Sequence, residues 1–279
     1  MAAERPSRRR RGRAAPPPSG EPPARNKTWL YGRHAVAAAL ANPRRRWSRL
    51  AALPAQEPEA QALAAAALAL RRGGGAPVAL LEREALAALL PAGAVHQGLA
   101  LEAEPLAPPD LDTLLRDLPA AAPPVVIVVL DQVADPQNVG AVLRAAAAFG
   151  AAAILEAAQG APPVSGTLAK AASGALEAVP LLRVVNLARA LDRLKTSGFW
   201  VCGLDAAAPQ TLGQIDLGDR IALVLGAEGS GLRRLTRERC DHLAHLPTRA
   251  TGATLNVAAA AAVALYQVTQ GRTAPPPST

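Results

Sequence analysis

The chain of 279 residues has few cysteines, few aromatic residues and no long apolar run, and these shortages exclude several classes of protein. Its two cysteines, Cys202 and Cys240, form no CxxC pair, which argues against a disulfide scaffold and indicates reduced thiols. No cysteine or carboxylate cluster completes a tetrahedral set with His242 and His245, so we expect no metal site. No apolar stretch approaches the roughly 18 residues that span a bilayer, which excludes an integral membrane protein.

The net charge of +8 lies mostly in the first 27 residues, which hold eight basic and two acidic side chains and almost nothing apolar. Such a segment cannot form a core, so we expect residues 1–27 to be disordered and to attract polyanions, nucleic acid above all. A solvated tail without a partner is the alternative. A mitochondrial presequence is disfavoured because Pro6 and the prolines at 16–18 would break its helix. We therefore expect a cytoplasmic protein.

The rest of the chain divides by composition into two folded units and a connecting segment. Residues 28–104 alternate short strands and helices and predict a small α/β unit. Residues 105–124 hold six prolines, which is typical of a semi-rigid linker. Strands and helices alternate over residues 125–272, which predicts a mostly parallel sheet with helices on both faces. The last residues, 273–279, are expected to be disordered.

The elements of the larger unit follow from its apolar runs and their breakers. The strand Val125–Leu130 is apolar at every position, which is typical of a strand buried on both faces. We expect helices over residues 139–149, 166–172, 187–196 and 255–270, and further strands over 152–155, 179–185, 199–204, 221–225 and 243–246. Asn138 is expected to cap the first helix, and Thr254 or Asn256 the last.

Three segments at the expected carboxyl ends of strands carry the candidate chemistry, because ligands of parallel sheets bind there. They are DQVADPQNVGAVLR over 131–144, GAEGSG over 226–231 and LPTRATGATLN over 246–256. Each has a plainer interpretation alone: a surface arginine at Arg144, a tight turn with a solvated Glu228, and a loop before a capped helix. GAEGSG has the reverse of the dinucleotide-binding spacing GxGxxG, and the motifs GxSxG and GxxxxGK[ST] are absent.

Taken in this order, the three segments resemble the three motifs of the SpoU (TrmH) branch of the SPOUT RNA methyltransferases. The matching stretches are residues 130–151, 221–234 and 245–267. Two further stretches, YGRHAVAAAL at 31–40 and VHQGLALEAEPL at 95–106, resemble the accessory domain of the RlmB-type ribosomal RNA 2′-O-methyltransferases. The resemblance covers about residues 29–271, everything except the tail.

The resemblance implies a fold that no periodicity predicts. It is a Rossmann-like parallel sheet with a trefoil knot, beside a small N-terminal α/β domain that binds RNA. The resemblance also implies S-adenosylmethionine as the cofactor, held in a bent shape by the loops of the second and third motifs, and a homodimer with each active site at the interface. The positions that match cofactor-binding residues are Gly226, Gly231, Leu246, Thr254 and Leu255.

The positions that match the family's catalytic residues are Asn138, Arg144, Glu228, Thr254 and Asn256, where Thr254 replaces the serine usual in the family. The implied reaction is a displacement in which a ribose 2′-hydroxyl attacks the sulfonium methyl group, so positioning is the first requirement. Because a guanidinium is a poor base, we expect Arg144 to stabilise the developing alkoxide and to hold a neighbouring phosphate. Glu228 is expected to orient the polar groups, which the two asparagines fix by hydrogen bonds.

The N-terminal unit is expected to recognise RNA by shape, with phosphate contacts from Arg33, His34, Arg44, Arg45 and Arg46. A solvated charged face is the plainer alternative for residues 44–46. Because of this accessory unit, we expect the substrate to be a guanosine ribose of large-subunit ribosomal RNA. A transfer RNA 2′-O-methyltransferase is one alternative, and a non-catalytic RNA-binding ribosome-assembly factor with the same fold is another. The basic tail is expected to strengthen binding without choosing the target.

Overall fold

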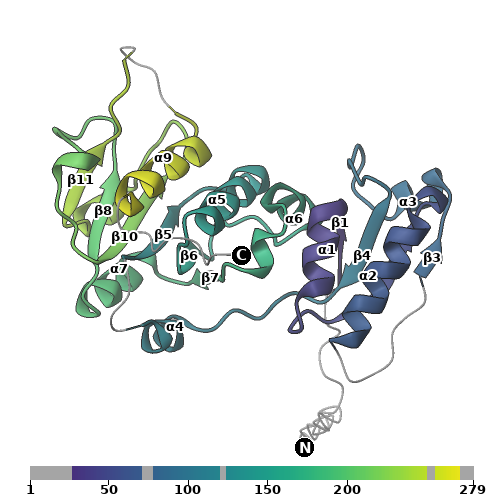
Figure 1. Cartoon of the computed structure of the whole chain (residues 1–279). Coiled ribbons are helices and arrows are strands. Elements are labelled where there is room, and N and C mark those ends of the chain that lie inside the picture. The colour runs from purple at the N-terminus through teal and green to yellow at the C-terminus, as the bar shows by residue number, and fades with distance from the viewer. Residues whose placement is uncertain (1–26, 71–77, 120–123, 250–254, 271–279) are drawn as a thin grey trace, which may run out of the picture.

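The computed structural model describes residues 27–70, 78–119, 124–249 and 255–270 (Figure 1). The expectations for the basic tail up to residue 26, for the C-terminus from residue 273 and for Thr254 lie outside these ranges. Within them the chain forms two sheets, one from its N-terminal third and one from the rest. Figure 1 shows the smaller domain beside helix α6 (Gly166–Ala172) of the larger one.

The smaller domain is a four-stranded sheet with helices, which confirms the predicted α/β unit. Its strands lie in the order β1-β4-β2-β3, and β1 pairs with β4 in antiparallel fashion. The pattern of apolar residues does not predict β1, because its segment TWLY does not alternate polar and apolar residues. The elements are β1 (Thr28–Tyr31), α1 (Arg33–Ala41), β2 (Trp47–Ala52), α2 (Glu57–Ala69), β3 (Val78–Leu80), α3 (Arg83–Ala88) and β4 (Leu99–Ala103).

The larger domain is built on a seven-stranded sheet in which every strand pair is parallel, as predicted. The strand order is β7-β6-β5-β10-β8-β11-β9, so the chain returns to the middle of the sheet after building one half. The trefoil knot stays a prediction. The strands are β5 (Val125–Asp131), β6 (Ala153–Ala157), β7 (Leu181–Val184), β8 (Trp200–Leu204), β9 (Gln210–Thr211), β10 (Arg220–Gly226) and β11 (His242–His245).

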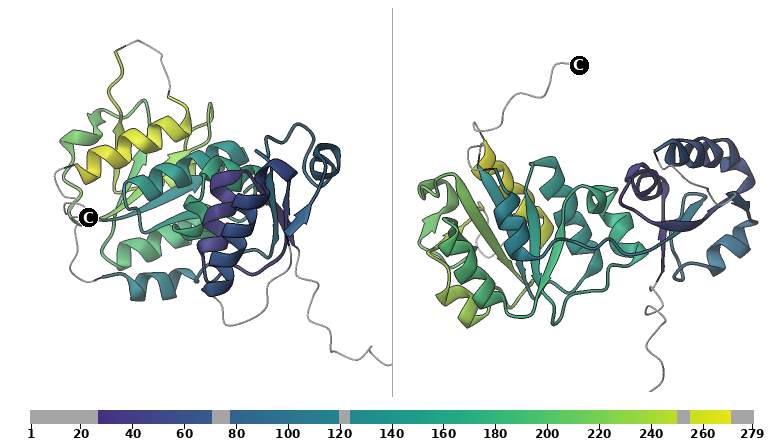
Figure 2. Two further views of the ribbon diagram at one scale, coloured as in Figure 1. Left: turned by 45° about the vertical axis from the view of Figure 1, so that its right-hand side comes forward. Right: turned by 90° about the horizontal axis from the view of Figure 1, so that it is seen from below.

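Helices cover both faces of this sheet (Figure 2). Strand β5 is buried along its whole length, and its alternate residues pack into two different cores, Val128 into one and Ile127 into the other. The first core lies under α5 (Pro136–Ala148), α6 and α9 (Val257–Thr269), and the second under α4 (Leu111–Asp117) and α7 (Leu187–Thr196). A short helix, α8 (Arg234–Glu238), lies beside α7. The prediction of a strand buried on both faces is confirmed.

Helix α5 begins earlier than predicted, and the prediction that Asn138 caps it is wrong. Asp135 is the cap, because its side chain accepts a hydrogen bond of 2.9 Å from the Gln137 amide, and Pro136 at the first position needs no N–H partner. Asn138 therefore lies inside the first turn with its amide free for another contact. At α9 the cap is Asn256, which accepts from the Ala259 amide at 2.8 Å.

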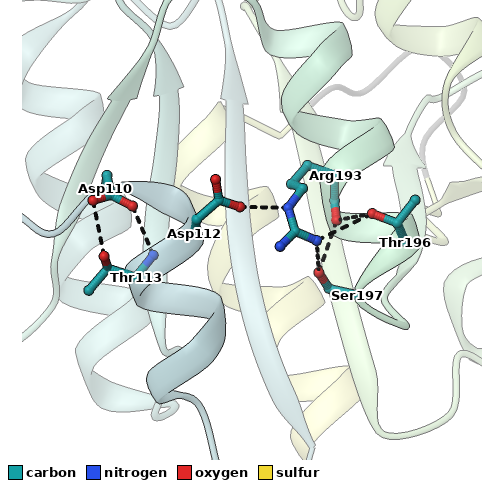
Figure 3. A network of polar contacts seen from close by, with 6 residues as sticks. All are labelled: Asp110, Asp112, Thr113, Arg193, Thr196 and Ser197. Atoms are coloured by element: carbon teal, nitrogen blue, oxygen red, sulfur yellow. Dashed lines mark hydrogen bonds and ion pairs between the residues drawn. The ribbon is translucent and has the colours of Figure 1, made fainter.

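The segment expected as a linker contains helix α4, which packs on the larger domain. Leu114 and Leu115 of α4 are buried in the core beneath α7. An ion pair of 2.6 Å joins Asp112 of α4 to Arg193 of α7, and Arg193 also donates to the Ser197 hydroxyl at 2.7 Å (Figure 3). Between β4 and α4 the chain forms no helix or strand and connects the two domains.

The prediction that Arg45 contacts phosphate is wrong, because its side chain is 2% exposed. Its guanidinium forms an ion pair with Glu177 of the larger domain at 2.5 Å and donates to the Glu104 carbonyl at 2.8 Å. The Glu177 carboxylate, in the turn η2 (Ala175–Glu177), also accepts from the Asn42 amide at 2.7 Å. The partner lies 132 residues away in the sequence, so no local pattern predicts the pair.

The two domains also meet along α6. The Tyr31 hydroxyl lies 3.1 Å from the Thr167 hydroxyl, and Lys170 donates to the side chain of Gln97. A Cβ atom on Gly166 would lie 2.2 Å from the Trp29 carbonyl oxygen, so only glycine permits this approach. The smaller domain is therefore docked on the larger one by buried and closely packed contacts.

Candidate functional site

A cavity of about 710 Å³ opens at the carboxyl ends of β8, β10 and β11, beside the N-terminus of α9. Ligands of parallel sheets bind at such strand ends, because the loops there meet at one edge. Six of the residues predicted for the site line this cavity and come from two of the three motif segments: Gly226, Glu228, Gly231, Leu246, Leu255 and Asn256.

The loop after β10 folds back on itself along one wall of the cavity. The Gly231 amide donates to the Ala227 carbonyl at 2.9 Å, which closes the loop. A Cβ atom on Gly226 would lie 2.2 Å from the Gly231 carbonyl carbon, and Gly231 has a φ of +64°. Glycine is therefore required at both ends of the loop. At these two positions the cavity wall is backbone alone.

Glu228 joins two of the motif segments on the rim of the cavity. Its Oε1 atom accepts a hydrogen bond from Asn138 Nδ2 at 3.1 Å and one from the Val257 amide at 3.3 Å. The second bond places a carboxylate at the N-terminus of α9, where the helix dipole favours negative charge. Glu228 thus connects the first turn of α5 to the first turn of α9. The orienting role expected of Glu228 stays a prediction.

One of the predicted catalytic residues, Arg144, is not brought to this rim within one chain. Arg144 is exposed on α5, does not line the cavity and makes no hydrogen bond or ion pair within the described ranges. Thr254 lies outside those ranges. The structure thus brings together Asn138, Glu228 and Asn256, and leaves Arg144 on the outer surface of α5.

One charged pair in the cavity, Asp205 and Arg237, is not predicted from the sequence. Asp205 follows β8 directly, and its Oδ1 atom accepts from the Ala207 amide at 2.9 Å. Its Oδ2 atom is buried and ion-paired with Arg237, yet it accepts no aligned hydrogen bond among the described residues. The signal that could have identified Asp205 is its place at the carboxyl end of a central strand.

The cavity fits the expected cofactor, S-adenosylmethionine. Its volume falls in the range of small-molecule sites, and the side chains of Leu225, Leu246 and Leu255 supply apolar surface for an adenine ring. The side chains of Glu228, Ser230 and Asn256 add polar groups to the cavity wall, and the glycine loop allows close approach to the backbone. The donors and acceptors of the cofactor therefore have counterparts here.

The remaining predicted RNA contacts lie on the surface of the smaller domain. His34, Arg44 and Arg46 are exposed. The Arg33 guanidinium, 63% exposed, forms an ion pair of 2.5 Å with Glu59. Their role in binding RNA stays a prediction.

The described residues contain no group of three or more metal-ligating side chains. None of the helices in the described part of the chain has the length and apolar content that a membrane span requires. Both cysteines are free, and burial raises the pKa of Cys202 and of Cys240 to about 12, so both thiols are protonated at neutral pH.

Two sequence families match the chain, one for each domain. Residues 125–266 match the SpoU rRNA Methylase family, and residues 29–109 match the family described as RNA 2′-O ribose methyltransferase substrate binding. The two matches cover the larger and the smaller sheet, respectively.

Curated relatives match over nearly their whole length. The 23S rRNA (guanosine-2′-O-)-methyltransferase RlmB of Coxiella burnetii is 40% identical over 250 residues, which is 89% of this chain and 98% of the relative. RlmB of Escherichia coli K12 is 36% identical over 243 residues, 87% of this chain and 98% of the relative.

Solved structures share the fold. The SpoU methyltransferase AviRb from Streptomyces viridochromogenes, in complex with AdoMet, has a TM-score of 0.70 and 22% identity, covering 88% of this chain and 90% of its own. An RNA 2′-O ribose methyltransferase structure has a TM-score of 0.72 and 23% identity, covering 89% and 90%. From its sequence match over the larger domain and its relatives, this chain belongs to the SpoU rRNA methylase family.

Proposed function

We propose that this chain transfers a methyl group from S-adenosylmethionine to the ribose 2′-hydroxyl of a guanosine in 23S ribosomal RNA. The RlmB relatives support this, because they match across both the catalytic and the substrate-binding domain. The observation that carries the proposal is the cavity at the strand ends, on whose rim Asn138, Glu228 and Asn256 are held together. Because its substrate is ribosomal RNA, we propose that the chain acts in the cytoplasm.

Five residues are assigned to binding the cofactor: Gly226, Gly231, Leu246, Thr254 and Leu255. S-adenosylmethionine supplies a methyl group made electrophilic by the sulfonium charge. The two leucines offer an apolar slot for the adenine, and the two glycines let the backbone approach it. Asp205 also lines the cavity, where its ion pair with Arg237 fixes the wall at the end of β8.

Glu228 is assigned to positioning rather than to proton transfer. It holds the Asn138 amide and the α9 N-terminus at the same oxygen atom, so it sets the distance between α5 and α9 at the cavity rim. The ribose hydroxyl has to approach the methyl group in line with the breaking bond, and this approach tolerates little displacement. Asn138 and Asn256 orient the sugar from the two sides of that rim.

Arg144 is assigned to stabilising the alkoxide that develops on the ribose and to binding the neighbouring phosphate. Arg144 does not line the cavity described in its own chain, so we propose that a second copy presents it to that cavity. A homodimer with active sites at the interface meets this requirement. Helix α9 offers a face for that contact, because its Val263 and Tyr266 are 45% and 51% exposed and the helix packs beside α5.

Mixing two inactive variants tests the homodimer. Arg144→Ala removes the guanidinium, and Gly226→Ala closes the cofactor loop onto Gly231. If Arg144 acts on the partner's cavity, refolded equal mixtures regain about a quarter of wild-type turnover, because half the dimers then hold one complete site. No regain, with dimers present in the mixture, would show that Arg144 acts within its own chain or not at all.

The RNA contacts of the smaller domain are assigned to Arg33, His34, Arg44 and Arg46, which are exposed. They are expected to bind phosphates and to orient the RNA without reading bases. Residues 1–27 are expected to add affinity by charge alone. Deleting them should weaken RNA binding and its salt dependence and leave the methylated nucleotide unchanged.

The direct test uses S-adenosylmethionine with a labelled methyl group, unmodified 23S rRNA and unmodified transfer RNA. We expect label at a single guanosine ribose of the ribosomal RNA and none with Arg144→Ala. Arg144→Lys should recover little turnover, because an ammonium group lacks the planar fork of a guanidinium.

The other outcomes separate the alternatives. Label on transfer RNA alone would keep the chemistry and overturn the assigned substrate. Label on neither RNA, with the cofactor still bound and assembling ribosomal particles also tested, would indicate a non-catalytic RNA-binding factor.

A further inference from the structure

A second groove, of about 450 Å³, lies at the carboxyl ends of β6 and β7 and beside α8. It shares no lining residue with the cofactor cavity. Six of the side chains that line it are exposed: Gln159, Val185, Asn186, Arg233, Arg234 and Leu235. None of the assigned cofactor or catalytic residues lies in it, so the proposed chemistry does not explain it.

Arg233 in this groove is held by a fully buried carboxylate. Asp131, at the end of β5, is 0% exposed and accepts from the Arg233 amide at 2.9 Å and from its Nε atom at 2.6 Å. The two terminal nitrogens of the guanidinium donate no hydrogen bond within the described ranges, and the side chain is 42% exposed. A buried acid that takes only Nε fixes the orientation of the fork and leaves its outer edge for an anion.

Apolar side chains flank the cations. Val185, directly after β7, is 94% exposed, and Leu235 of α8 is 56% exposed. Buried apolar side chains, Ala157 and Leu187 among them, line the groove beside these two. The exposed amide of Gln159 adds a donor and an acceptor, and it has no partner among the described residues. A fixed cation can bind a phosphate, a free amide can bond to a base edge, and exposed apolar surface can cover a base.

The position of the groove fits an RNA that enters the cofactor cavity. Both openings lie at the carboxyl edge of one parallel sheet, the groove at β6 and β7 and the cavity at β8, β10 and β11. One segment joins them, because residues 226–232 line the cavity and 233–236 line the groove. The docked RNA-binding domain packs against α6, which connects β6 to η2 and β7. The groove thus lies in the half of the sheet next to that domain.

We propose that this groove binds a nucleotide of the substrate RNA next to the methylated one. Its phosphate contacts Arg233 and Arg234, and its base covers Val185 and Leu235. The inference rests on the proposed function and adds a second contact point for the same strand. Arg234 has to exchange its exposed ion pair with Glu238 for the phosphate, which costs little because exposed pairs are weak.

The test avoids Arg233, whose removal would leave Asp131 buried without its partner. Instead it combines Arg234→Gln with Leu235→Gln, two exposed positions in the groove. The control is Arg239→Gln, an arginine of similar setting that pairs with Asp192 and does not line the groove. Binding of an unmodified 23S rRNA fragment is measured at several salt concentrations, and binding of S-adenosylmethionine by calorimetry.

We expect the double variant to bind the RNA about tenfold more weakly, since one phosphate contact and one base contact are lost. The slope of log affinity against log salt should fall by about 0.7 for one phosphate of a single strand. Affinity for S-adenosylmethionine should not change, and Arg239→Gln should match the wild type in all three measurements. Unchanged RNA affinity in the double variant would overturn the inference.

A photocrosslinker locates the contact. Benzoylphenylalanine in place of Leu235 should crosslink to RNA within a few nucleotides of the methylated guanosine. Crosslinks to a second protein chain would instead identify a protein-binding surface and overturn the inference, as would crosslinks to distant RNA. A wild-type chain that neither binds nor methylates ribosomal RNA would remove the proposed function itself, a result distinct from failure of the groove variants alone.

Discussion

Glu156 on β6 is a buried carboxylate that has no part in the proposed reaction. Its side chain is 3% exposed and forms an ion pair of 2.8 Å with Arg183, while its Oε2 atom has no hydrogen-bond partner in the described ranges. Burial raises the pKa of this carboxyl, and the bond and charge of Arg183 offset that effect only in part. The folded protein therefore binds the proton more tightly than the unfolded chain does.

The sign of the resulting pH dependence follows from that order of pKa values. As pH rises from the ordinary pKa of a glutamate through the raised pKa in the fold, Glu156 loses its proton in the unfolded chain first, and the free energy of unfolding falls. Glu156→Gln removes this loss. Urea unfolding at pH 4.5 and at pH 8 should show the variant gaining stability relative to the wild type at the higher pH. If the stabilities of Glu156→Gln and the wild type change in parallel between the two pH values, burial of Glu156 does not set this pH dependence.

Glu228, unlike Glu156, is exposed, and its proposed role is to position the groups to which it is hydrogen-bonded at the cavity rim. Glu228→Ala frees both Asn138 and the α9 N-terminus, so we expect turnover to fall roughly 100-fold, in line with displacements of about 1 Å in other enzymes. Glu228→Gln retains an accepting oxygen and should lose less than about tenfold by the same reasoning. Affinity for S-adenosylmethionine should change little in both variants. Equal losses in the two variants would indicate that the charge, and not the hydrogen bonds, is required.

At the scale of elements, local chemistry predicts helix ends well where a cap and a breaker agree. Helices α6 and α7 have the bounds that the sequence predicts, 166–172 and 187–196. Helix α5 starts three residues before its predicted first residue. Asp135 and Pro136 are typical of a turn, but the same pair can also begin a helix, as it does here. The short elements β1, β9 and α8 are not predicted, because their segments TWLY, QT and RLTRE contain neither a long apolar run nor a regular alternation.

The cap of α9 gives a prediction that separates stability from chemistry. Asn256→Ala removes the hydrogen bond to the Ala259 amide and should lower the free energy of unfolding by about 1 kcal/mol. Asn256→Asp keeps an accepting oxygen at the cap and adds a charge that the helix dipole favours, so its stability should stay near that of the wild type. Turnover should fall in both variants if the amide N–H groups orient the ribose. Full turnover in Asn256→Asp would assign Asn256 to the cap alone.

At the scale of the whole molecule, the sequence predicts two units but not how they meet. Apolar periodicity predicts which side chains are buried within each sheet, and the motif segments predict most of the cavity wall. The contact between the two domains, or seam, depends instead on residue pairs far apart in the chain, such as Arg45 with Glu177 and Tyr31 with Thr167. The surface position of Arg144 is likewise a property of three-dimensional packing, because its helix packs with its other faces on α6 and α9.

The buried pair at the seam makes the docking of the RNA-binding domain testable. Glu177→Ala leaves the Arg45 guanidinium, 2% exposed, without its counter-charge, which costs about 3–5 kcal/mol for buried pairs of this kind. The domains can avoid that cost by separating, so we expect faster proteolysis between β4 and α4 and slower methylation of ribosomal RNA, with unchanged affinity for S-adenosylmethionine. Asp112→Ala, which breaks the exposed pair with Arg193, should cost less than about 1 kcal/mol.

Replacing both Arg45 and Glu177 distinguishes the effect of domain docking from the effect of the two charges. Arg45→Met combined with Glu177→Leu fills the same space with apolar side chains, and such replacements are often neutral or stabilising. The double variant should therefore recover the protease resistance that Glu177→Ala loses. If it also recovers methylation of ribosomal RNA, a fixed position of the RNA-binding domain is what the reaction needs. Recovery of protease resistance without methylation would instead give Arg45 or Glu177 a direct role with the RNA, which their burial argues against.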